Sequence, residues 1–134
     1  MRAISQRRQM ETTGFLDITA GMGRFCPTGE YSLVEAEALI ADAISVCRDR
    51  GIGRLFVDAT GMTGVPIPTL VERFLIAEEW AQASGGMVIV ALVVPAEYIH
   101  PRKFGVSVAA DRGMVSDVFT SETEALDWLA DKHA

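Results

Sequence analysis

Hydrophobic and polar positions along this chain fall into blocks that predict strands and helices in turn. Residues 15–20 alternate weakly between apolar and polar side chains, which suits an edge strand. Residues 24–28 can return beside it as a second short strand, which Pro27 keeps at an edge. Residues 55–58 predict a buried strand, and residues 87–94 are apolar throughout, as a central strand covered on both faces is.

Helix signals separate these strands. The clearest helix spans residues 33–50, because Ser32 and Glu35 have the spacing of a capping box and Gly51 follows as a C′ residue. Apolar residues recur on one face of this segment: Leu33, Ala36, Leu39, Ile40, Ala43, Ile44 and Cys47. The pattern is that of a surface helix with one side toward the core.

Three further helices are expected. Their start signals are two more capping-box pairs and a proline, namely Thr69 with Glu72, Ser121 with Glu124, and Pro101. The helix behind Thr69 is expected to run to Ser84, and its apolar residues wrap widely around it. A stripe that broad suggests deep burial or a partner surface. The helix from Pro101 is expected to end at Gly113, before a last strand over residues 115–119.

The order of these elements predicts the fold class. Strands that alternate with helices imply an α/β domain with a largely parallel sheet and right-handed crossover connections. At 134 residues, the chain is long enough for one domain with its own core. We expect this domain to span residues 14–134, behind a flexible segment of residues 1–13.

Composition and charge disfavour several classes of function. A net charge of −6 and a pI of about 4.8 disfavour a nucleic-acid-binding surface. The longest apolar run, residues 87–95, is too short for membrane insertion, and residues 1–13 lack the apolar run of a secretory signal. The two cysteines are too few for a disulfide framework or a zinc site, so a cytoplasmic location is the simplest expectation.

Catalytic, cofactor and metal motifs find no match, so we expect neither an enzyme nor a cofactor. Asp58, which ends a buried strand, is the most notable carboxylate. It can accept backbone N–H bonds from the following loop and fix the turn, or it can bind a ligand, and we favour the first role. Cys47 lies on the apolar face of its helix, where a thiol stays protonated and inert.

Basic and aromatic residues gather at residues 98–104 of an otherwise acidic protein. Such a cluster can clamp an anionic head group or an acidic partner, or it can be the solvated start of a helix. Arg73, one turn into the second helix, can pair with Asp58 or bind an anion, and we favour the pair.

Three runs of the chain, taken in order, resemble one protein family. They read VDATGMTGVPIPTLVERFLIAEEW, VALVVPAEYIHPRKFGVSVAADRG and VFTSETEALDWL. The set is similar to STAS-like proteins related to bacterial anti-sigma-factor antagonists, over residues 14–131. The resemblance implies the STAS fold, a mixed, largely parallel β-sheet with helices packed mainly on one face. The same branch also resembles small CRAL-TRIO-like lipid-binding domains, which enclose an apolar ligand.

One feature of the family pattern is missing. A typical antagonist switches partners by phosphorylation of an Asp-Ser pair in the loop before the second helix. Residues 55–60 match the strand and the start of that loop, but residues 65–68 read Val-Pro-Ile-Pro and offer no hydroxyl. Thr63 and Thr69 are the nearest candidates, and Thr69 is already expected to cap a helix. The apolar loop suits the lip of a pocket or a protein contact.

The function expected first is a non-enzymatic binding domain for a small apolar or amphipathic, lipid-like ligand. Its pocket would lie between the loop of residues 63–69, the second helix and residues 98–104, with Arg73 or Arg102 at the polar end. The expected ligand- or partner-binding residues are Asp58, Thr63, Pro66, Thr69, Arg73, Phe74, Tyr98, Arg102 and Phe104.

The alternative is a regulatory module that docks on a protein partner. It would use the same loop together with Ile76 and Trp80, and a homodimer through these residues is a variant of it. An enzyme built around Asp58 is the third and least supported possibility.

Overall fold

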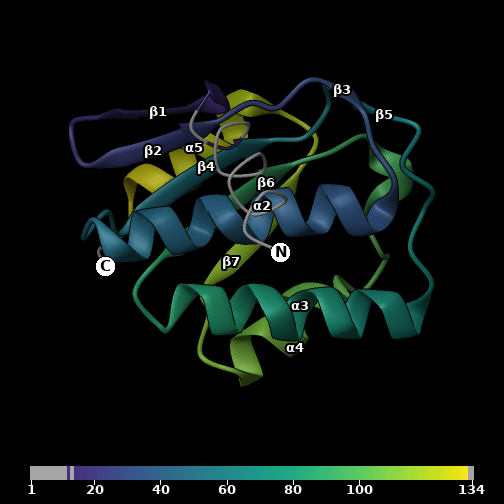
Figure 1. Ribbon diagram of the computed structural model, residues 1–134. Coiled ribbons are helices and arrows are strands. Elements are labelled where there is room, and N and C mark those ends of the chain that lie inside the picture. The colour runs from purple at the N-terminus through teal and green to yellow at the C-terminus, as the bar shows by residue number, and fades with distance from the viewer. Residues whose placement is uncertain (1–11, 13, 133–134) are drawn as a thin grey trace, which may run out of the picture.

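A five-stranded sheet organises the computed structural model, which describes residue 12 and residues 14–132 (Figure 1). The order across the sheet is β1-β2-β4-β6-β7. The first pair of strands is antiparallel and every other pair is parallel, so the mixed, largely parallel sheet is confirmed. The strands are β1 (Leu16–Thr19), β2 (Met22–Phe25), β4 (Arg54–Asp58), β6 (Ile89–Val93) and β7 (Ser116–Phe119).

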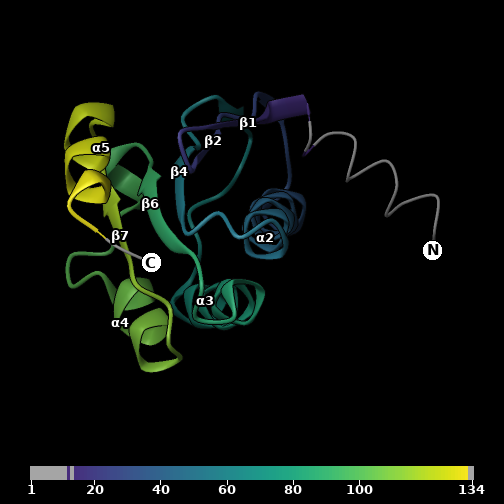
Figure 2. The same ribbon diagram turned by 90° about the vertical axis from the view of Figure 1, so that its left-hand side faces the viewer.

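Helices cover both faces of this sheet, three of them on one side. They are α2 (Leu33–Asp49), α3 (Leu70–Ser84), α4 (Phe104–Asp111) and α5 (Glu122–Ala130). From β2 to β7 the chain moves across the sheet in one direction. Right-handed crossovers therefore place α2, α3 and α4 on the same face. The last helix, α5, follows β7 and lies on the opposite face (Figure 2).

Alternate residues of the central strands fill two cores, because side chains along a strand point to opposite faces. Leu55 and Val57 of β4 belong to the core beneath α2, α3 and α4. Phe56 between them is fully buried with Ala125 and Leu129 of α5. The strand expected to be covered on both faces, now β6, is buried in the same way, which confirms that prediction.

A second, two-stranded sheet was not predicted. It pairs β3 (Gly29–Glu30) with β5 (Met62–Thr63) in parallel. The backbone N–H of Tyr31 adds a bond of 2.9 Å to the carbonyl of Thr63. A Cβ atom at position 61 would lie 2.8 Å from the Pro27 carbonyl oxygen, so only glycine allows this close approach. The small sheet ties the loop after β4 to the start of α2.

Helix starts agree with the sequence at three of four places, since Ser32, Thr69 and Ser121 are the N-caps of α2, α3 and α5. Both reciprocal bonds of the capping box are present at α2 and at α3. At α5 the Ser121 hydroxyl accepts the N–H of Glu124 at 3.3 Å, which forms one half of the expected box. The helix expected from Pro101 begins at Phe104, so that prediction is wrong by three residues. Lys103 has a φ of 50°, a left-handed conformation that no helix can contain.

Two expectations concern the chain as a whole. The flexible segment predicted for residues 1–13 lies outside the described residues, apart from Thr12, which is buried. In the described part of the chain, no helix combines the length and the apolar character needed to cross a bilayer.

The N-cap of α3 supports a first prediction. Thr69 Oγ1 accepts the backbone N–H of Glu72 at 3.2 Å, which satisfies one of the unpaired donors at the helix start. We expect Thr69→Ala to lower the free energy of unfolding by about 1 kcal/mol in urea titrations. Thr69→Ser keeps the hydroxyl and is the control; an equal loss in both variants would contradict a capping role.

Candidate functional site

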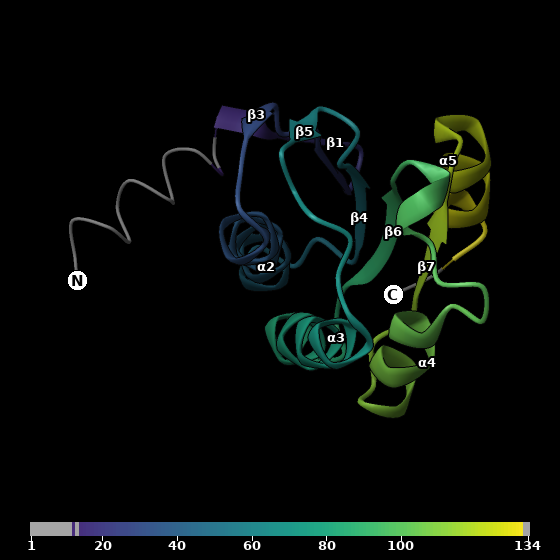
Figure 3. The ribbon, with the colours of Figure 1, turned by 90° about the vertical axis from the view of Figure 1, so that its right-hand side faces the viewer.

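An apolar cavity of about 150 Å³ lies between α3, α4 and the β6–β7 side of the sheet. Figure 3 shows α3 and α4 side by side below these strands. Residues of the sheet form the floor, and the two helices form the walls. The apolar residues that line it include Ile76, Ala77, Trp80, Val90, Leu92, Gly105, Val106, Ala109, Met114 and Val118.

Small residues on the two helices explain the cavity. Ala77 of α3 and Ala109 of α4 are buried in the core, where each offers only a methyl group. Gly105 also lines the space, and a Cβ atom added there would meet nothing within 4 Å. Larger side chains at these three positions would fill the volume. An apolar cavity of about this size in another protein stays dry and holds a benzene molecule.

An ion pair lies beside the cavity at the β7 edge of the sheet, where Asp117 shares a strand face with Phe119, which packs against α5. Lys103 Nζ lies 2.7 Å from Asp117 Oδ1, and both residues line the space. The same carboxylate oxygen accepts the backbone N–H of Val118 at 2.8 Å, which fixes its orientation. The Lys103 ammonium also lies 5.8 Å from the centre of the Phe119 ring. The lysine charge is therefore matched within the protein.

Arg73 joins the same cavity from α3. Its Nη1 donates a hydrogen bond of 2.8 Å to the backbone carbonyl of Tyr98. The Tyr98 hydroxyl in turn donates to the carbonyl of Val65 in the loop before α3. These two bonds hold the helix, the loop and the segment after β6 together at the rim of the cavity.

The pair expected between Arg73 and Asp58 is not formed, because Arg73 reaches the Tyr98 carbonyl instead. Asp58 stays within its own turn. Its Oδ1 accepts the backbone N–H of Thr60 at 3.0 Å and the Thr60 hydroxyl at 2.6 Å. The turn-fixing role expected for Asp58 thus agrees with its hydrogen bonds.

A second cavity of about 110 Å³ adjoins the first, between α2, α3 and the loop after β4. The two spaces share a wall made of Pro68, Ile76, Trp80 and Tyr98. Trp80 Nε1 donates to the carbonyl of Glu37 at 3.0 Å. Since Tyr98 and Trp80 are both held by hydrogen bonds, the wall that separates the cavities is fixed at two points.

Arg73 and Tyr98 are the only two of the nine expected binding residues that line the first cavity. The guanidinium carbon of Arg112 lies 5.3 Å from the centre of the Phe74 ring. The Phe104 ring packs against the His100 ring. Neither ring lines this cavity. Both lie on α3 and α4 as expected, and both pack against the core beneath these helices.

The remaining expected residues lie outside the first cavity as well. Thr63 donates its hydroxyl to the carbonyl of Gly29 at 3.2 Å, and Thr69 caps α3. Pro66 and Arg102 are exposed. Ile76 and Trp80, expected on an outer surface, instead form the wall between the cavities.

The sequence did not reveal Lys103 and Asp117 as a pair. Lys103 belongs to the basic cluster at residues 98–104, but Asp117 lies fourteen residues later on a strand. No spacing rule links the two positions. Their contact depends on how α4 returns the chain to β7.

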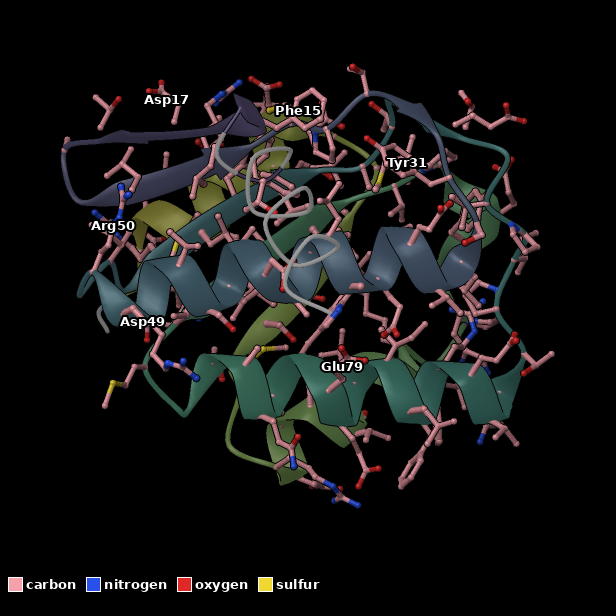
Figure 4. The ribbon with its side chains drawn as sticks, in the orientation of Figure 1. Phe15, Asp17, Tyr31, Asp49, Arg50 and Glu79 are labelled. Carbon is pink, nitrogen blue, oxygen red and sulfur yellow. The ribbon has the colours of Figure 1, made fainter. Side chains whose placement is uncertain are left out.

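Two carboxyl groups meet between α2 and α3. Glu79 lies on the side of α3 that faces α2 (Figure 4) and shares a hydrogen bond with Glu37. Burial, followed by the hydrogen bond and the negative charge of Glu79, raises the pKa of Glu37 to about 7. Glu37 also lines the second cavity, so this cavity has a carboxyl group that titrates near neutrality.

The thiols are unsuited to catalysis. Burial raises the pKa of Cys47 to about 11, as expected for a core cysteine. Burial also raises the pKa of Cys26. Among the side chains of residue 12 and residues 14–132, no three of the types His, Cys, Asp and Glu come together as a metal site.

Comparisons with known proteins contribute little to the function. No protein-family description matches the chain, and no curated protein matches it. An NMR structure of the protein TM1081 matches this chain with a TM-score of 0.49 and 16% sequence identity. The match covers 87% of this chain and 88% of that one. The function must therefore be inferred from the geometry of the site.

The raised pKa of Glu37 makes stability depend on pH. The pKa of about 7 in the folded protein exceeds the ordinary value of 4.5, so the folded protein binds this proton more tightly than the unfolded chain does. The resulting stabilisation is complete below about pH 4.5 and is lost as the pH rises through about 7. We expect Glu37→Gln, which cannot ionise, to melt at a higher temperature than the wild type near pH 8 and at a similar temperature near pH 5.

Glu79→Gln is the matched variant, because it removes the repulsion from the other side and should reduce the same pH dependence. Melting temperatures followed by circular dichroism between about pH 5 and pH 8 test both variants. If the melting temperatures of the wild type and Glu37→Gln change with pH in parallel, Glu37 does not cause the pH dependence.

Proposed function

We propose that this protein is a non-enzymatic, STAS-like binding domain that takes a small apolar or amphipathic ligand in the cavity between α3, α4 and the sheet. The supporting observation is a mostly apolar space whose lining includes Arg73 of α3. Each buried methylene of a ligand contributes about 0.8 kcal/mol. Arg73 would receive the polar end of an amphipathic molecule.

The cavity is partly open to solvent, and its volume sets the size of the apolar part that a ligand can bury in it. About 150 Å³ matches a single aromatic ring or a short branched chain, rather than the extended tail of a membrane lipid. A longer ligand would have to displace Trp80 or Tyr98 to reach the second cavity, and it would break the hydrogen bond that holds either side chain. The likeness to lipid-binding domains therefore supports the class of ligand but not its length.

Phosphate control is not part of this proposal. The threonines nearest to the usual acceptor position both serve the structure, Thr63 by bonding Gly29 and Thr69 by capping α3. Both cysteines are free thiols, which supports a reducing compartment such as the cytoplasm.

A second candidate function is a protein-interaction module, and an exposed apolar surface supports it. The patch consists of one loop residue and three residues in the first two turns of α3, each more than half exposed: Ile67, Leu70, Val71 and Leu75. Contiguous apolar patches of this kind mark contacts with other proteins. A partner protein or a second copy of the chain would cover it, and the predicted interface residues Ile76 and Trp80 would lie behind it.

Native mass spectrometry of gently purified protein tests the carrier function. We expect a discrete small-molecule adduct on the folded protein that appears as a free molecule after denaturing extraction. Gly105→Leu is the matched variant, because its side chain would occupy the cavity, and we expect it to lack the adduct. A clean apo mass for the wild type would overturn the carrier function and favour the interaction module.

Replacement of Val71 and Leu75 by lysine separates the two candidates. Both side chains are exposed, so we expect the double variant to fold and to keep the adduct of the wild type. If the patch is an interface between two copies, light scattering after size exclusion should show a dimer for the wild type and a monomer for the variant. Loss of the adduct in a folded variant would contradict ligand binding inside the cavity.

A further inference from the structure

We infer that the ligand of the α3–α4 cavity is a small monocarboxylate with an apolar body about the size of one aromatic ring, and that Arg73 binds its carboxylate. This inference rests on the proposed function, because it names the ligand class for the same cavity. Three features support it: the charge balance of the lining, the geometry of Arg73 and the volume of the space.

The charges that line the cavity do not cancel. They belong to Arg73, Lys103 and Asp117. The lysine is matched by Asp117 at 2.7 Å, whereas the hydrogen-bond partner of Arg73 is the uncharged carbonyl of Tyr98. His100 also lines the cavity. Its Nδ1 accepts the backbone N–H of Arg102 at 3.0 Å, which the neutral imidazole can do.

One positive charge at the rim of the cavity is thus left without a charged partner. A ligand that carries one negative charge would supply that partner. A neutral ligand would expel water from the cavity and still leave the Arg73 guanidinium without a negatively charged partner. A phosphate group carries about −1.5 to −2 charges at neutral pH, which exceeds the imbalance.

Arg73 is also oriented for this role. One of its N–H groups donates to the Tyr98 carbonyl, which anchors one end of the planar guanidinium at the rim of the cavity. The remaining donors of that plane can meet both oxygens of a carboxylate in parallel. Arg102, the other cation considered for the polar end, is exposed and does not line the cavity.

The volume sets the apolar part of the ligand. A ring fits the space next to Ala77, Ala109 and Met114 without movement of the wall that separates the two cavities. Benzoate combines such a ring with one carboxylate and is therefore a suitable probe. Benzyl alcohol has a similar body without the charge, and decanoate has the charge on a longer chain.

The test is an NMR titration of protein labelled at the methionine methyl groups, because Met114 lies buried in the lining. We expect benzoate to shift the Met114 signal saturably and benzyl alcohol to bind about tenfold more weakly or worse. Arg73→Gln should weaken benzoate by a similar factor of about ten. Arg102→Gln removes the same charge outside the cavity and should leave the affinity unchanged.

Arg73→Lys provides a second variant in case Arg73→Gln does not fold. It keeps the charge but loses the planar pair of donors, and we expect an affinity between those of the wild type and Arg73→Gln. Equal binding of benzoate and benzyl alcohol, or equal effects of Arg73→Gln and Arg102→Gln, would overturn the role of Arg73 and leave the cavity as a binding site. Tighter binding of decanoate than of benzoate would overturn the size limit. Absence of binding by all three probes would overturn the ligand class, and a clean apo mass in addition would remove the proposed function.

Discussion

The path of the chain across the sheet is the constraint on which the rest of the structure depends. Every parallel connection from β2 to β7 moves in the same direction, and right-handed crossovers then place α2, α3 and α4 on one face. The side chains of these three helices and of the sheet must fill the space between them. Where α3 and α4 meet the strands, the chain supplies alanine and glycine at Ala77, Gly105 and Ala109, and the volume is left unfilled.

The same constraint explains why α3 is apolar around so much of its circumference. One side packs on the sheet through Ala77 and Ala81, which are buried. A second side, with Ile76 and Trp80, separates the two cavities. A third side, with Val71 and Leu75, is exposed. A periodicity argument recognises that such a helix is unusual, but it cannot distinguish a cavity wall from an outer surface, because both consist of the same residue types.

Features that depend on residues close in sequence could be predicted. Features that depend on contacts between distant parts of the chain could not. Capping boxes join residues three positions apart, so Ser32 with Glu35 and Thr69 with Glu72 were evident. The left-handed conformation of Lys103 was not, because glycine or asparagine usually marks it. For the site, the sequence placed Arg73 and Tyr98 near a pocket, but their contact and the Lys103–Asp117 pair are tertiary. The two phenylalanines were assigned to the correct helices, where they pack against the core without lining the cavity.

The two candidate functions use opposite sides of the first turns of α3 and need not exclude each other. Val71 and Leu75 face away from the cavity, whereas Arg73 between them reaches its rim. The geometry nevertheless favours a ligand as the primary partner. An exposed apolar patch leaves no polar group unsatisfied, whereas a cavity that contains an arginine without a carboxylate partner combines empty apolar volume with an unmatched charge. In the proposed function, one small anion with an apolar body would fill this volume and pair with Arg73.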